Sequence, residues 1–331
     1  MNSSTPHLSS SSQWEDGHTP IDQPQRVRLI GAPCDAGAAR AGARLGPDAL
    51  RIAGLADALA AQGVAVQDGG NLRGPASAVH RQPRPDRSGL HHLDACVRWC
   101  GLVHEAVAQA LAGGSLPLLL GGDHHLAMGS IPAVAQHCAR QGKTLRVVWL
   151  DAHADCNDAR SSPSGNIHGM PVSVLLGHGP QALQALARPP LPATALRQVG
   201  LRSVDAAEKA RIARFGIEAY DMRAIDELGM PEVMRRVLRD VHAPDVHLHL
   251  SFDVDFLDPE LAPGTGTTAR GGPTYREAQL CMEMLADTGC LGSMDLVELN
   301  PVLDVRNQTA ELVLDLLQSL FGKSTLVRAA S

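Results

Sequence analysis

Short apolar runs rich in β-branched residues recur along the chain from Arg26 onward and alternate with longer stretches of helical periodicity. This alternation is typical of βαβ units, in which consecutive strands lie parallel and helices connect them. The sequence therefore predicts an α/β fold around a mainly parallel sheet.

The predicted strands are the apolar runs at 27–31, 116–120, 145–150, 197–201, 246–252 and 293–298. The predicted helices lie near 47–62, 92–112, 126–141, 222–241, 274–288 and 308–321. In the helix at 92–112 the apolar residues keep near-helical spacing, and Gly113 and Gly114 follow as a stop signal. Two stretches, 69–91 and 177–195, break the rhythm with glycine or proline and are predicted to be surface excursions.

A single catalytic domain over residues 26–331 is favoured over two domains, because neither excursion separates two periodic halves and the chain shows no internal repeat. Residues 1–25 have no apolar segment of the kind found in a secretory signal, and we predict that they form a disordered tail.

The charge and composition narrow the class of partner. The formal net charge is −6 without a cluster of Lys and Arg, and aromatic residues make up 3% of the chain, so a nucleic-acid partner is not expected. No apolar run approaches the roughly 18–20 residues of a membrane span. Seven scattered cysteines favour a reducing cytoplasm, and a small cationic substrate suits the acidic chain.

Acidic and histidine residues follow four of the predicted strands. GGDHH at 121–125, DAHAD at 151–155, DVD at 253–255 and Glu298 each come directly after an apolar run. The carboxyl ends of parallel strands share one edge of a sheet, where ligands bind. We therefore expect these segments to converge in space.

Alternate residues of DxHxD and DxD point the same way in extended backbone, toward a common ion. With one further histidine they supply enough ligands for two divalent ions with bridging carboxylates: His124, Asp151, His153, Asp155, Asp253 and Asp255. This oxygen-rich set favours manganese, although the raw affinity order leaves zinc open. Two such ions can share a water and lower its pKa, so the predicted chemistry is hydrolysis.

Each of these motifs alone has a simpler interpretation, as a capping or solvated acid or as a buried histidine of the core. Because the motifs occur together at the ends of several predicted strands, we favour a metal site over these simpler interpretations. His247 and His249 alternate with apolar residues in a predicted strand, and we expect no site role for them.

The motifs GGDHHLAMGS, DAHADCN, SPSGNIHGMP, SFDVDFLDPELAPGTGT and VELNPVLD together resemble the ureohydrolase family, and within it the arginases, over about residues 26–326. The resemblance implies a three-layer α/β/α sandwich, a dinuclear manganese centre and a homotrimer or homohexamer. It also implies that His124, Asp151, Asp155 and Asp253 hold one ion. Asp151, His153, Asp253 and Asp255 would hold the other, so that Asp151 and Asp253 bridge.

The segment NDARSSPSGNIHG at 157–169 resembles arginases rather than agmatine-type relatives. Its side chains can donate hydrogen bonds to the α-carboxylate that arginine has and agmatine lacks: Asn157, Ser162, Ser164 and Asn166. Asp205 and Glu208 would accept from the α-amino group. The other interpretation of these two acids is a helix first turn capped by Ser203.

By the same resemblance Glu298 pairs with the guanidinium of L-arginine and orients it above a metal-bridging hydroxide, and His168 shuttles a proton to the departing amine. Together with Asp155 these are the predicted catalytic residues, and the predicted products are L-ornithine and urea.

The chain departs from common family patterns at His125, where serine is common, at Asp158 and Ser203, and in TTARGG at 267–272, where Arg270 adds a positive charge. Three alternatives stay open. One is hydrolysis of agmatine, guanidinobutyrate or a formimino compound, and another is a non-catalytic arginine-binding homologue. An unrelated metallophosphoesterase is the third, but the GNHD-type motif it would need is missing from the sequence.

Overall fold

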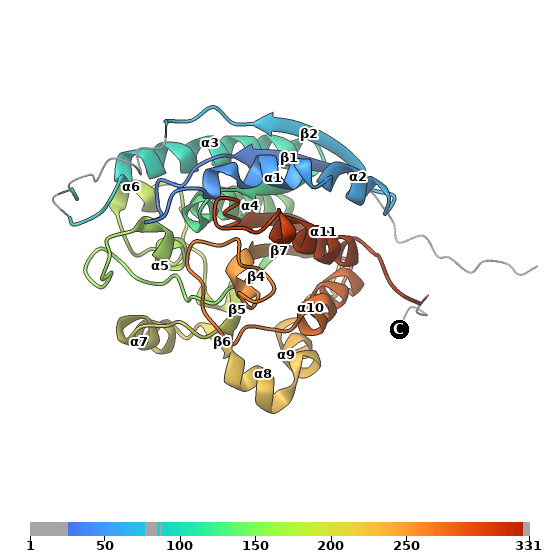
Figure 1. Cartoon of the computed structure of the whole chain (residues 1–331). Coiled ribbons are helices and arrows are strands. Elements are labelled where there is room, and N and C mark those ends of the chain that lie inside the picture. Colours follow the sequence, from blue (N-terminus) through green and yellow to red (C-terminus); the bar gives the residue numbers. More distant parts are fainter. Residues whose placement is uncertain (1–25, 77–84, 87, 327–331) are drawn as a thin grey trace, which may run out of the picture.

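The computed structural model describes residues 26–76, 85–86 and 88–326, so the tail predicted for residues 1–25 lies outside the described residues. Within this part of the chain eight strands form one all-parallel sheet in the order β2-β1-β3-β8-β7-β4-β5-β6. Figure 1 shows this sheet with helices on both sides of it. The strands are β1 (Arg26–Ala32), β2 (Ala65–Asn71), β3 (Leu116–Gly121), β4 (Thr144–Leu150), β5 (Leu196–Leu201), β6 (Glu218–Asp221), β7 (Val246–Asp253) and β8 (Leu291–Val297).

Helices cover both faces of this sheet. One face packs against α1 (Gly46–Ile52), α2 (Leu55–Ala60), α8 (Met222–Leu228), α9 (Met230–Val237), α10 (Tyr275–Asp287) and α11 (Gln308–Leu320). The other packs against α3 (Leu93–Ala112), α4 (Ala127–Gln141), α5 (Pro171–Leu175), α6 (Gln181–Gln184) and α7 (Ala206–Phe215). The predicted three-layer α/β/α sandwich is confirmed, with a sheet that is parallel throughout.

The central strands are apolar in consecutive positions because both of their faces are buried. In β3, Leu118 and Leu120 belong to one apolar core while Leu119 belongs to the other. Neighbouring side chains of a strand point to opposite faces, so a run of leucines serves both layers at once.

The six predicted strands are confirmed, and the two that the sequence did not reveal are the edge strands β2 and β6. The first reads AVQDGGN, and its last residues overlap the excursion predicted at 69–91, while the second has four residues. Edge strands need neither length nor an apolar pattern, because one of their sides has no neighbouring strand.

The single helix predicted over 222–241 is wrong. Gly229 has φ 78° and separates α8 from α9, and Pro231 then occupies the first turn of α9. A left-handed glycine stops one helix and a proline suits the start of the next. Gly54, with φ 91°, divides the predicted helix at 47–62 in the same way.

The site-bearing segments follow β3, β8, β7 and β4, which are four adjacent strands at the centre of the sheet. Because all four strands are parallel, their carboxyl ends lie along one edge. Among the described residues, no helix has the length and apolar character needed to cross a membrane.

Asp240 ties α9 to the sheet through two arginines. It accepts from Arg197 Nη1 at 2.6 Å and from Arg146 Nε at 2.9 Å. Arg197 is buried and also faces Glu218. The hydrogen bond from Arg197 and then that from Arg146 hold the pKa of Asp240 well below its usual range.

We expect Asp240→Asn to lower the free energy of unfolding at pH 7 by about 0.5–1 kcal/mol, because a buried guanidinium loses a charged partner whose side chain is 38% exposed and therefore screened by solvent. The depressed pKa means that this stabilisation is full above the ordinary value of 3.8 and is lost as the pH falls through the folded value. Urea unfolding at a series of pH values measures it. Asp226→Asn, on an exposed position of α8, is the control, and equal effects of the two changes would contradict the assignment.

Candidate active site

His124 lies in the turn after β3 and faces three carboxylates. Its Nδ1 is 2.9 Å from Asp253 Oδ2, 3.2 Å from Asp151 Oδ2 and 3.3 Å from Asp155 Oδ2. All four side chains are buried. Segments that follow β3, β4 and β7 therefore meet at one point, as the parallel sheet predicted.

A second group of ligand atoms shares Asp151 with the first. His153 Nδ1 lies 3.1 Å from Asp255 Oδ2 and 3.4 Å from Asp151 Oδ1. Asp151 thus turns one oxygen toward each histidine, which is the position of a bridging ligand. The six residues predicted to hold metal all come together at this edge of the sheet.

The carboxylates of this cluster repel one another in a buried setting. Burial, and then the charge of Asp151, raise the pKa of Asp155 well above its usual range. Burial, and then the charge of Asp255, do the same for the pKa of Asp253. On His124 the nearby carboxylates outweigh burial and raise its pKa to about 9. The cluster is thus a strong attractor of positive charge.

A pair of divalent ions fits these donors. His124, Asp151 and Asp155 supply ligand atoms within 4.8 Å of one another, and so do Asp151, His153 and Asp255. Four carboxylates and two imidazoles match the preference of hard or intermediate divalent cations. Two histidines alone do not neutralise four buried carboxylates, whereas two cations do.

A second layer of side chains orients these ligands. The ring of Trp149 stacks on His124 with centroids 4.1 Å apart, and its Nε1 donates to Asp151 at 2.9 Å. Ser251 Oγ lies 2.9 Å from His124 Nε2. Sequence reasoning missed both residues, yet each precedes a ligand aspartate by two positions along a strand and so shares its face.

Glu298 and His168 form a pair beside the ligands. Glu298, whose φ is 64°, accepts at Oε1 from the backbone N–H of His124 at 2.9 Å and lies 3.0 Å from His168 Nδ1. Burial alone would lower the pKa of His168, but the hydrogen bond and charge of Glu298 outweigh it and raise this pKa.

A cavity of about 480 Å³ opens beside these groups. The predicted substrate residues all line it, together with His153, Asp155, His168 and Asp253: Asn157, Ser162, Ser164, Asn166, Asp205, Glu208 and Glu298. The amide nitrogen of Asn157 donates to Asp205 at 2.8 Å, and its buried oxygen has no hydrogen-bond partner among the described residues. Arg270 is not among the lining residues of the described chain.

Asp205 itself is the N-cap of α7, so the interpretation with Ser203 as the cap is wrong. Its Oδ1 accepts hydrogen bonds from the backbone N–H groups of Ala207 and Glu208. Glu208 Oε2 in turn accepts from the backbone N–H of Asp205, which completes a capping box. Glu208 also accepts from the N–H of Cys156 at 3.2 Å. A rigid helix start therefore forms this wall of the cavity.

Arg202 was not predicted and organises the loop that carries Asp255. Its guanidinium donates to five carbonyl oxygens: those of Gly200, Asp255, Phe256, Leu257 and Ala269. Thr267, in the TTARGG segment, donates to Asp255 Oδ2 at 3.0 Å. Contacts to backbone carbonyls have no sequence motif, so only the structure reveals this role of Arg202.

The sequence profile of the arginase family matches residues 25–322. The chain belongs to the arginase family.

Individual relatives agree with this membership. The chain is 42% identical over 302 residues to an arginase of Brucella melitensis, covering 91% of this chain and 97% of the relative. It superposes on the native arginase structure of Bacillus caldovelox with a TM-score of 0.85 at 40% identity, over 92% of this chain and all of that one. An Entamoeba histolytica arginase crystallised with L-ornithine gives a TM-score of 0.82 at 30% identity, over 91% and 99% of the two chains.

In this member of the arginase family we expect Arg202→Lys to weaken the binding of divalent metal by about 10–100-fold, the usual effect of removing an outer partner of a ligand. Lysine has one donor group and cannot hold five carbonyl oxygens, so the turn bearing Asp255 would shift. Equilibrium dialysis against manganese measures the affinity. Arg223→Lys, at an exposed position of α8, is the control. Unchanged metal affinity in Arg202→Lys would show that the loop holds Asp255 without this residue.

Proposed function

We propose that this protein is an arginase, which hydrolyses L-arginine to L-ornithine and urea with two manganese ions bound by the six clustered residues. Membership in the arginase family and relatives named as arginases support the reaction. The observation that carries the proposal is the cavity, because its lining combines hydrogen-bond donors and acceptors suited to an α-amino acid with predicted metal ligands and the carboxylate of Glu298.

The amino-acid end of the substrate would lie against the segment 157–166 and the start of α7. Asn157, Ser162, Ser164 and Asn166 supply groups that can donate to the α-carboxylate. Asp205 and Glu208 place negative charge toward the α-amino group, as the family resemblance implies. Agmatine, without the α-carboxylate, would leave the donors unpaired, and unpaired polar groups reduce binding.

The metal ions would be held by His124, Asp151, Asp155 and Asp253 on one side and by Asp151, His153, Asp253 and Asp255 on the other. Bound there, two divalent ions lower the pKa of a shared water and so make a nucleophile available near neutral pH. The abundance of carboxylate ligands, with only two imidazoles, supports manganese over a metal that prefers thiolate.

Glu298 would bind the guanidinium of the substrate. Its Oε1 already accepts from the N–H of His124 and faces His168, so Oε2 remains for the planar cation. His168 is held through Nδ1, which leaves Nε2 to deliver a proton to the departing amine. Its raised pKa keeps a proton available there.

All seven cysteines lie in the described part of the chain and none forms a disulfide, which supports a cytoplasmic location. A homotrimer or homohexamer is proposed from family membership alone. Hydrolysis of another guanidino or formimino compound is the second candidate, and a non-catalytic arginine-binding role the third.

The proposal is tested by urea release from L-arginine and, in parallel, from agmatine, with manganese-loaded protein and Asp255→Ala as the blank. We expect urea from arginine alone. Urea from agmatine alone would support the proposed metal centre but contradict arginine as the substrate. Urea from neither compound would favour a non-catalytic arginine-binding role.

In the same assay Asn157→Ala and Ser164→Ala are each expected to lower kcat/KM for arginine by about 10–100-fold, because a hydrogen bond to a charged group is worth about 1.5–3 kcal/mol. Any residual turnover of agmatine should change little. An equal loss of kcat/KM on the two substrates would contradict the proposed hydrogen bonds from these residues to the α-carboxylate.

We expect His168→Asn to lower kcat by about 10²-fold with little change in KM, since a positioned proton donor contributes to the transition state rather than to binding. Steady-state kinetics with arginine measure both constants. The matched control is His178→Asn, whose ring stacks on Phe215 away from the cavity. A rise in KM at constant kcat would assign His168 to substrate binding instead.

A further inference from the structure

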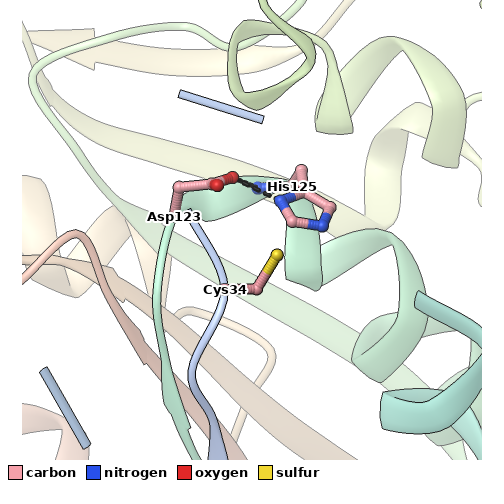
Figure 2. A group of neighbouring side chains, drawn as sticks. All are labelled: Cys34, Asp123 and His125. Atoms are coloured by element: carbon pink, nitrogen blue, oxygen red, sulfur yellow. Dashed lines mark hydrogen bonds and ion pairs between the residues drawn. The ribbon is translucent and has the colours of Figure 1, made fainter. Parts of the chain in front are cut away.

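A second cluster of metal-ligating side chains lies outside the dinuclear centre. Cys34 follows β1, and Asp123 and His125 flank the ligand His124 after β3. The Cys34 sulfur, a carboxylate oxygen of Asp123 and a ring nitrogen of His125 lie within 4.8 Å of one another (Figure 2). All three side chains are fully buried.

Asp123 orients the imidazole of His125. One carboxylate oxygen of Asp123 accepts from the N–H of His125 at 3.1 Å and bonds His125 Nδ1, the contact drawn in Figure 2. The other oxygen accepts from the N–H of Gly37 at 2.9 Å. An ion bound by Cys34, Asp123 and His125 would be coordinated through Nδ1, the ring nitrogen that faces this oxygen, with the ring proton on Nε2.

The second nitrogen of this ring is unused. His125 Nε2 is buried and has no hydrogen-bond partner among the described residues. The ring is therefore held through Nδ1 alone, on the side that faces Asp123. Cys100 adds another thiol nearby, since its Sγ donates to the main-chain oxygen of His125 at 3.3 Å.

We propose that Cys34, Asp123 and His125 bind one further divalent ion of the zinc class, distinct from the dinuclear centre. Thiolate, imidazole and carboxylate are the ligands that zinc takes in proteins, whereas manganese prefers oxygen ligands without thiolate. Binding would convert the Cys34 thiol to a thiolate and release one proton to solvent.

The two centres are separated by the direction of successive side chains. His124 turns its Nδ1 to Asp151, Asp155 and Asp253, while His125 turns its Nδ1 to Asp123. In the described chain, none of the three proposed ligands lines the cavity of the active site. His125 stands where serine is common in the family, so this site would be particular to chains that carry the histidine.

Cobalt substitution separates the two centres, because only a thiolate ligand gives a sulfur-to-cobalt charge-transfer band in the near ultraviolet. We expect wild-type protein loaded with Co²⁺ to show this band and zinc to abolish it by competition. Cys34→Ser and His125→Ser should each remove the band and one metal equivalent per chain, measured by plasma mass spectrometry. Asp255→Ala should keep the band.

Cys156→Ser is the matched control, because Cys156 is a buried thiol that directly follows the ligand Asp155. The proposal is overturned if wild-type protein shows no band, if Cys156→Ser rather than Cys34→Ser removes it, or if both Cys34→Ser and His125→Ser keep the wild-type metal content. Two independent ligand variants guard against misfolding of either one, which circular dichroism reports. The proposed arginine hydrolysis is judged by urea release and does not depend on this result.

Discussion

Mutual repulsion among four buried carboxylates is the constraint on which the active site depends. The parallel sheet brings Asp151, Asp155, Asp253 and Asp255 to one edge, where water cannot solvate them. The two histidines of the cluster neutralise only part of that charge, so the arrangement is stable with bound cations and strained without them. The fold thus creates a demand for positive charge that two divalent ions would satisfy, and the same field would favour the cationic guanidinium of the proposed substrate.

Rigidity around the cluster comes from the side chains that surround the six predicted ligands. Trp149 and Ser251 hold His124, and Arg202 holds the turn of Asp255 through backbone carbonyls alone. Glu298 links the N–H of His124 to the ring of His168. A shift of one element would therefore reach metal ligands and substrate groups together, which is why preorganisation of this kind favours catalysis.

Much of this architecture could be predicted from the sequence, because strands buried on two faces are continuously apolar and the ligand motifs follow them directly. The edge strands β2 and β6 were missed since they lack that apolar signal, and the break at Gly229 was missed since periodicity continues across it. Arg202 was missed because it contacts main-chain carbonyls of a loop distant in sequence. The cluster of Asp123 and His125 was missed because its third member, Cys34, comes from the loop after another strand.

At the start of α7, the capping role of Asp205 is compatible with its proposed contact to the α-amino group of the substrate. Asp205 commits Oδ1 to the first turn of its helix, while Oδ2 meets Asn157 at 2.8 Å. Capping fixes the backbone and the carboxylate in one geometry, so little entropy would remain to be lost if a substrate amine bound there as proposed. The helix start adds a partial positive charge that keeps this carboxylate ionised. The N-cap of a helix therefore suits a carboxylate acceptor that must be both rigid and ionised.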